Sequence, residues 1–131
     1  MARKCEHIIT SKNGKRAIFI DSLNKEQILA YWKRDERHTD KFRFISELIL
    51  LGISSKKHYC KVEINNKCKD VTEMRFFVRQ ENDRIYCKEI RSSEGVFIIV
   101  AVILHENKKS EGLSSKEKAE IEKVGGYQYE L

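Results

Sequence analysis

The sequence has little that is typical of a membrane or secreted protein. Its longest uninterrupted apolar run, Val96–Leu104, has nine residues, whereas a helix that crosses a bilayer needs about 20. A secretory signal has a long apolar stretch near the N-terminus, but here Met1 is followed by the charged residues Arg3, Lys4 and Glu6. We therefore expect a cytoplasmic protein without a membrane partner.

Motifs of common enzyme classes and metal sites are also missing. The chain has no Gly-rich phosphate-binding loop, no His-Glu-x-x-His metal motif and no Gly-x-Ser-x-Gly nucleophile turn. Its cysteines form no Cys-x-x-Cys pair of the kind found in zinc and thiol-redox sites; they are Cys5, Cys60, Cys68 and Cys87. We expect free thiols in a reducing compartment, and neither a metal nor a cofactor.

The chain does have abundant charge together with enough apolar residues for a core. Its 131 residues are 40% hydrophobic and 35% charged, which predicts a single folded domain over residues 1–131. The 26 Lys and Arg residues exceed the 20 Asp and Glu residues and give a net charge of +6. Such a surplus attracts polyanions such as nucleic acid, although many soluble proteins have one.

The N-terminal part predicts a β-hairpin followed by two helices. Residues 8–10 and 16–20 flank Asn13-Gly14, a pair that favours a tight type I′ turn. A first helix is expected from residues 22–24 to residues 35–38. A second is expected from Thr39 or Asp40 to Gly52. The two should form a helical hairpin that packs on one face of a sheet.

The C-terminal part predicts most of that sheet and a last helix. A short strand at Val62 and Ile64 precedes an antiparallel meander whose strands are Val71–Gln80, Arg84–Arg91 and Val96–Leu104. The last of these is apolar at every position and should therefore lie inside the sheet. Ser114 and Glu117 have the spacing of a capping box for a short charged helix from about Ser115 to Val124. The expected fold class is α+β with an antiparallel-rich sheet.

Basic and aromatic residues alternate on two of the predicted strands. Arg75, Phe77 and Arg79 would share one face of the first, and Arg84, Tyr86 and Lys88 would share one face of the second. If both rows lie on the same side of the sheet, they form a cationic patch suited to phosphate contacts and base stacking. The sequence does not fix that register, and any one of these residues alone would more often be an ordinary surface or packing residue.

A histidine and two lysines follow the predicted buried strand, at His105, Lys108 and Lys109. RNA cleavage through attack of a 2′-hydroxyl needs a base, cations for the charge that builds on phosphate, and an acid for the leaving oxygen. Arg and Lys could supply the cations, and His105 the base or the acid. A lone histidine is more often not catalytic.

In their order and spacing, these pieces resemble the RelE/HigB superfamily, nearest its phage-associated HigB-like branch. Glu73-Met74-Arg75 is similar to the Glu-Leu-Arg of that family, and Arg84-Ile85-Tyr86 to its Arg-hydrophobic-aromatic strand start. The buried strand, the post-strand basic segment and the capped helix continue the resemblance. It covers roughly Arg16 to the C-terminus and treats residues 1–15 as an additional N-terminal hairpin arm.

The resemblance implies a RelE-like fold and a toxin of a type II toxin–antitoxin system. Such a toxin is a metal-independent endoribonuclease (an mRNA interferase) that cuts mRNA, usually on the ribosome, and is held inactive by an antitoxin. Two alternatives remain open. One is a non-catalytic nucleic-acid-binding or regulatory protein on the same fold, and the other is a phage-related protein-interaction module that uses the basic face to bind another protein.

Residue roles follow from matched positions in that family. Arg75 would stabilise the phosphate and Arg84 would contact phosphate or support the patch. Lys108 or Lys109 would bind RNA or assist proton transfer, with His105 as a further acid or base. Arg79, Tyr86 and Lys88 complete the expected RNA-binding set.

Overall fold

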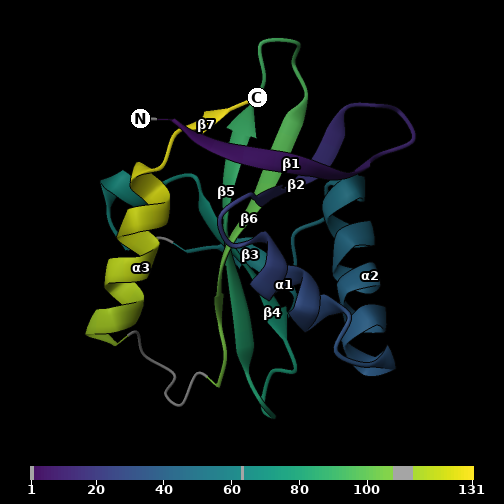
Figure 1. Cartoon of the computed structure of the whole chain (residues 1–131), viewed down its shortest axis with the longest axis vertical. Coiled ribbons are helices and arrows are strands. Elements are labelled where there is room, and N and C mark those ends of the chain that lie inside the picture. Colours follow the sequence, from purple (N-terminus) through teal and green to yellow (C-terminus); the bar gives the residue numbers. More distant parts are fainter. Residues whose placement is uncertain (1, 63, 108–113) are drawn as a thin grey trace.

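A computed structural model describes residues 2–62, 64–107 and 114–131 (Figure 1). Within them the strands are β1 (Arg3–Thr10), β2 (Arg16–Asp21), β3 (Tyr59–Lys61), β4 (Val71–Phe76), β5 (Asp83–Arg91), β6 (Phe97–His105) and β7 (Tyr129–Glu130). The helices are α1 (Lys25–Trp32), α2 (Glu36–Leu51) and α3 (Ser115–Gly126), with one short 3-10 helix at Asn66–Cys68. The class is α+β, as predicted.

The strands form one seven-stranded mixed sheet in the order β3-β4-β5-β6-β2-β1-β7. The meander β4-β5-β6 is antiparallel, and β6 lies inside the sheet between β5 and β2, both as predicted. However, β6 pairs with β2 in parallel, and β7 pairs with β1 in parallel. A parallel pair needs a long crossover connection, and here the chain from α1 to β5 supplies the one between β2 and β6.

Helices cover both faces of the sheet. The uniformly apolar sequence of β6 predicted that both its faces are covered and put the helical hairpin on one of them, but it assigned no element to the other face. Ile28 of α1 and Ile45 of α2 are fully buried on the face that includes Ile99 of β6. On the opposite face, Ile121 of α3 packs with Val100, the next residue of the same strand. Successive residues of β6 therefore serve two separate cores, which explains why this strand is apolar throughout. Figure 1 shows α1 and α2 on one side and α3 on the other.

The N-terminal hairpin is present, but its turn differs from the prediction. Gly14 has a φ of 74°, whereas Asn13 does not have the positive φ that a type I′ turn requires. Instead the Asn13 side chain accepts hydrogen bonds from Ser11 Oγ at 2.7 Å and from the backbone N–H of Lys15 at 2.9 Å. These bonds stabilise a longer loop over residues 11–15.

The break between the two helices was predicted too late in the chain. Helix α1 ends at Trp32 and α2 begins at Glu36. Asp35 is the reason, because its carboxylate caps α2 by accepting the backbone N–H of His38 at 2.8 Å. The predicted end at Gly52 is correct, and Gly52 has the left-handed φ of 75° that favours glycine.

Strand β4 was predicted to reach Gln80 but ends at Phe76. Phe77 and Arg79 have φ values of 55° and 72°, which take the backbone out of the extended region. The short strand expected at Val62 and Ile64 lies just earlier, as β3. As a result Arg79 is on a turn and does not share a strand face with Arg75.

The capping box of α3 is confirmed. Glu117 N–H donates to Ser114 Oγ at 3.1 Å, and Ser114 N–H donates to Glu117 Oε1 at 3.2 Å. The helix continues past the predicted end at Val124 to Gly126. Glycine is required at Gly125, because a Cβ there would lie 2.5 Å from the carbonyl oxygen of Lys67.

Asp21, at the end of β2, joins the two ends of the chain. It is fully buried, and its carboxylate accepts hydrogen bonds from Arg3 Nε at 2.8 Å and from the Tyr129 hydroxyl at 2.6 Å. The backbone N–H groups of Leu23 and Asn24 also donate to it. Burial opposes ionisation, but these hydrogen bonds outweigh it and hold the pKa of Asp21 below its ordinary value.

The state of the cysteines and the character of the helices relate to two expectations from the sequence, free thiols and the absence of a membrane-spanning segment. All four cysteines are free thiols, and burial raises the pKa of Cys5 to about 11. Across residues 2–62, 64–107 and 114–131, the structure contains no helix with the length and apolar character needed to cross a membrane.

Candidate nucleic-acid interface

Three of the predicted catalytic residues form a single row across the sheet. Arg75 of β4 lies opposite Arg84 of β5, and Arg84 lies opposite His105 of β6. Residues directly opposite in antiparallel strands point to the same face with Cβ atoms roughly 5 Å apart. The register that the sequence left open thus puts these three side chains on the α3 face of the sheet. We refer to them as the catalytic row, after the role that the sequence predicts for them.

Glu73 partly neutralises this row. Arg75 Nε donates to Glu73 Oε1 at 2.6 Å, and Arg84 Nε lies 3.6 Å from the same oxygen. Only 6% of Arg84 is exposed, and its Nε has no hydrogen-bond partner among the described residues. Burial lowers the pKa of Arg84, while Glu73 opposes this effect. One carboxylate thus holds two guanidinium groups in place and leaves the row with a positive excess.

Tyr86 and Lys88, which the sequence placed in an exposed patch, lie beneath α3 instead. The Tyr86 hydroxyl donates to Glu117 Oε2 at 3.2 Å, and burial raises the pKa of this phenol. Lys88 Nζ donates to the carbonyl oxygen of Gly125 at 2.8 Å and lies 3.4 Å from Asp70 Oδ2. Both side chains are buried, so they hold α3 on the sheet and are not exposed to a base or a phosphate.

His105 is accessible only in part. Its side chain is 17% exposed, and Nδ1 lies 3.5 Å from Glu120 Oε1 of α3. Glu120 of α3 therefore pairs with the end of the catalytic row. Lys108 and Lys109, the other predicted residues of this segment, lie outside the described residues.

A cleft with a volume of about 360 Å³ lies beside Arg75. Its charged and titratable lining residues are Lys41, Lys57, His58, Arg75 and Arg79, and its apolar walls include Phe77 and Val78. None of the described residues that line it is acidic. We call it the basic cleft. It brings Arg79, one of the predicted RNA-binding residues, together with Arg75.

The loop before β3 forms one wall of the basic cleft. The carbonyl oxygen of His58 accepts the backbone N–H of Arg75 at 2.8 Å, and the carbonyl oxygen of Lys56 accepts Arg75 Nη1 at 2.6 Å. The His58 ring packs edge-on against Phe44 of α2, with 4.8 Å between centroids. Burial lowers the pKa of His58, and Lys41 and Lys57 lower it further. His58 therefore lies in a positive potential.

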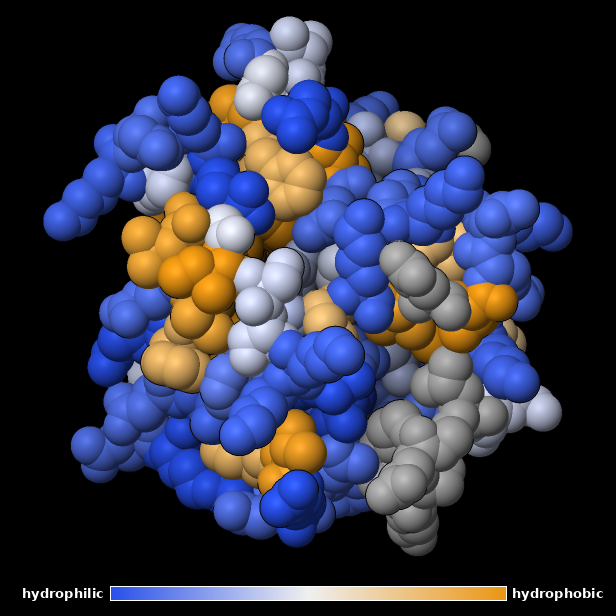
Figure 2. All heavy atoms as spheres, turned by 180° about the vertical axis from the view of Figure 1, so that it is seen from behind, coloured by the Kyte–Doolittle hydropathy of each residue, from blue (hydrophilic) through white to orange (hydrophobic). Residues whose placement is uncertain are grey.

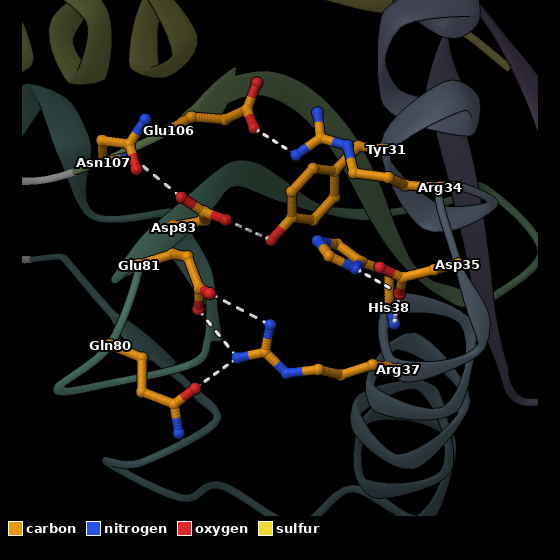
Figure 3. Close-up of polar contacts among 10 residues, drawn as sticks. All are labelled: Tyr31, Arg34, Asp35, Arg37, His38, Gln80, Glu81, Asp83, Glu106 and Asn107. Atoms are coloured by element: carbon orange, nitrogen blue, oxygen red, sulfur yellow. Dashed lines mark hydrogen bonds and ion pairs between the residues drawn. The ribbon is translucent and has the colours of Figure 1, made fainter.

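The turn between β4 and β5 forms the opposite wall and is anchored to α2 (Figure 3). The guanidinium of Arg37 binds both carboxylate oxygens of Glu81, at 3.0 and 2.8 Å, and also the side-chain oxygen of Gln80. It also lies 3.6 Å over the Phe77 ring. These contacts fix the turn that carries Arg79.

A buried carboxylate holds the end of the same turn. Asp83 is 2% exposed; it accepts the Tyr31 hydroxyl at 2.6 Å and the backbone N–H of Asn107 at 2.8 Å. Figure 3 shows this group pointing between α1 and the end of β6. The turn is thus attached to α1 through Tyr31, to α2 through Arg37, and to the segment after β6 through Asn107.

Apolar side chains lie exposed beside the basic cleft. Phe44 is 45% exposed and Val78 is 38% exposed, and further along α2 Leu51 is 73% exposed. Figure 2 views the molecule from behind and shows apolar side chains gathered at its left, within a largely hydrophilic surface; this side corresponds to the right of Figure 1, where α2 lies. The cleft therefore combines cations with accessible apolar surface.

Comparison with protein-family models, curated proteins and solved structures finds no match for this chain. No sequence motif marks Lys41, Lys57 or His58 as residues of a site. No local pattern connects them to Arg75, because they meet it only through the pairing of β3 with β4 and the packing of α2.

Proposed function

We propose that this protein is an RNA-cleaving toxin of the RelE/HigB type that binds single-stranded RNA at the catalytic row and cuts it without a metal ion. The observation that carries the proposal is that Arg75, Arg84 and His105, chosen for their motif positions, lie side by side in one row. Arg75 also borders the basic cleft, so one cation faces both surfaces.

The row offers groups for transphosphorylation. The 2′-hydroxyl of RNA attacks the adjacent phosphorus, its proton passes to a base, and the 5′-oxygen leaves with a proton from an acid. The products are a 2′,3′-cyclic phosphate and a 5′-hydroxyl. Arg75 would stabilise the charge that builds on the phosphate oxygens, and the buried Arg84 would support the row through Glu73. His105, or else Lys108 or Lys109, would transfer a proton.

A non-catalytic RNA-binding protein is the second candidate, and a specific observation favours it. Arg84 is almost fully buried, and Glu120 already pairs with His105. A row covered in this way could support the fold while the basic cleft alone binds RNA. The two candidates differ in whether RNA is cut.

Controlled expression followed by mapping of cellular RNA ends tests the proposal. A toxin would arrest growth and produce new cuts inside open reading frames, and purified protein would cut RNA in the presence of EDTA. Coexpression of a cognate antitoxin would restore growth. Normal growth with intact transcripts at confirmed expression would reject the nuclease and leave the RNA-binding candidate.

A further inference from the structure

We infer that the basic cleft is a second RNA subsite, which adjoins the catalytic row at Arg75 and binds the phosphate and base of one flanking nucleotide. The inference rests on the proposed function in taking single-stranded RNA as the ligand. It assigns RNA-binding roles to Lys41, Lys57 and His58. Arg79 keeps its predicted RNA-binding role, but in the cleft and not on the face of the sheet.

Charge is the first argument. Four cationic side chains, of Lys41, Lys57, Arg75 and Arg79, line one cleft, and none of the described lining residues is acidic. Ordinary protein surfaces mix the two signs, so a concave site of one sign concentrates the opposite charge. Burial lowers the pKa of His58 in the same cleft, and Lys41 and Lys57 lower it further, as a positive potential would.

Size and polarity are the second argument. Pockets for small ligands begin at roughly 300 Å³, and this cleft, at about 360 Å³, suits one nucleotide rather than a folded partner. Val78 lines it, and Phe44 contacts His58 at its edge; both are more than one-third exposed. Exposed aromatic and apolar groups beside cations suit a nucleotide, since a base can stack while its phosphate binds a cation.

Rigidity is the third argument. Arg37 holds the Arg79 turn through Glu81, and it also lies over Phe77 in the cleft wall. His38 packs edge-on against the same Phe77 ring with 4.9 Å between centroids. Because these walls are already fixed, a ligand does not have to order them, and more of its interaction energy is retained as affinity.

Arg75 connects the two sites. It borders the cleft, and it also stands opposite Arg84 in the catalytic row. A strand of RNA with one phosphate near Arg75 can thus place its neighbouring nucleotide in the cleft. The cleft would strengthen binding without contributing to the chemical step.

The test uses a fluorescent 2′-O-methyl RNA oligonucleotide, which has no free 2′-hydroxyl and is bound without being cut. The full chain is compared with the double variant Lys57→Ala/Arg79→Ala and with the control Lys12→Ala/Lys15→Ala. All four side chains are exposed, so both doubles should keep the wild-type melting temperature. The control pair removes the same charge from the β1–β2 loop.

The cleft double should bind RNA roughly tenfold more weakly. Its plot of log affinity against log salt should also become shallower by about 0.7 for each phosphate that the variant no longer neutralises. The control double should bind nearly as well as the wild type. Equal weakening in the two doubles, or unchanged binding in the cleft double, would overturn the subsite. Polyglutamate competing as well as RNA would also overturn it, in favour of an acidic protein partner.

The same measurements distinguish a failure of the proposed RNA cleavage from a failure of the proposed subsite. A wild-type protein that binds the oligonucleotide through Lys57 and Arg79 but leaves unmodified RNA intact would reject cleavage and keep the subsite. A wild-type protein that cuts RNA while the cleft double binds normally would reject the subsite and keep cleavage.

Discussion

Glu73 and Arg75 lie two residues apart on β4, and the Arg75 Nε–H donates to Glu73 Oε1 over 2.6 Å. The same carboxylate is the nearest counter-ion of the buried Arg84. Glu73→Gln should therefore destabilise the fold by about 3 kcal/mol, since an uncompensated buried charge remains. Urea denaturation measures this effect. An unchanged midpoint would show that Arg84 does not depend on Glu73.

Arg75→Ala should lower RNA cleavage by roughly 100-fold or more, because it removes a cation from the charge that develops on phosphate. The melting temperature should change little, since the side chain is partly exposed and contributes little core volume. Arg91→Ala, at the exposed end of β5, is the matched control and should cleave normally. Full activity in a folded Arg75→Ala protein would remove Arg75 from the site.

His105→Gln tests proton transfer. A general acid or base contributes roughly 100-fold or more to rate, so cleavage should fall by that factor while RNA binding changes little. His58→Gln should leave the rate of the chemical step nearly unchanged. If His105→Gln cleaves at the wild-type rate over about pH 5 to 8, the range in which histidine titrates, the role passes to Lys108 or Lys109.

Asp21→Asn tests the link between the chain ends. The folded-state pKa of Asp21 is lowered, so its contribution to stability is present above the unfolded value of about 3.9 and is lost as the pH falls through the folded value. The variant should be less stable than the wild type by about 2 kcal/mol at neutral pH, and the gap should narrow below about pH 4. Denaturation at several pH values measures it, with the exposed Asp40→Asn as control. A pH-independent gap would contradict the linkage.

Tyr31→Phe removes the hydroxyl that donates to Asp83 inside the molecule. Because Asp83 keeps only part of its hydrogen bonding, the variant should lose about 1 to 3 kcal/mol of unfolding free energy. Tyr127→Phe is a suitable control, since its hydroxyl makes no hydrogen bond with the described residues. Equal stability of the two variants would show that the bond to Asp83 contributes little.

The elements that the sequence predicted well are those defined by neighbouring residues. The capping box at Ser114 and Glu117 and the stop at Gly52 depend on local geometry, and the meander follows from short links between apolar segments. Phe77 was misassigned for the opposite reason. An aromatic residue favours a strand, but contacts with Arg37 and His38 from α2 hold Phe77 in a left-handed conformation.

The residues of the candidate site also fall into two groups, those whose position the sequence predicted and those whose surroundings it did not. Arg75, Arg84 and His105 could be chosen from motif positions, and strand pairing then brought them together. Tyr86 and Lys88 share their sheet face, yet α3 covers them through Glu117 and Gly125. Alternation along a strand indicates which side chains share a face, but it contains no information on what packs over that face.

The position of β6 between β5 and β2 has a consequence for how the chain folds. Arg16 of β2 pairs with Phe97 of β6, so the pairing spans about 80 residues, and pairings this distant in sequence slow folding. During synthesis β1, β2, α1 and α2 emerge first, while one edge of β2 stays without its partner. An emerging chain that has not reached Phe97 therefore presents an open strand edge beside apolar surface, a state prone to aggregation. His105 follows Phe97 in the chain, so the pairing of Arg84 with His105, and with it the catalytic row, also has to wait until β6 has been synthesised.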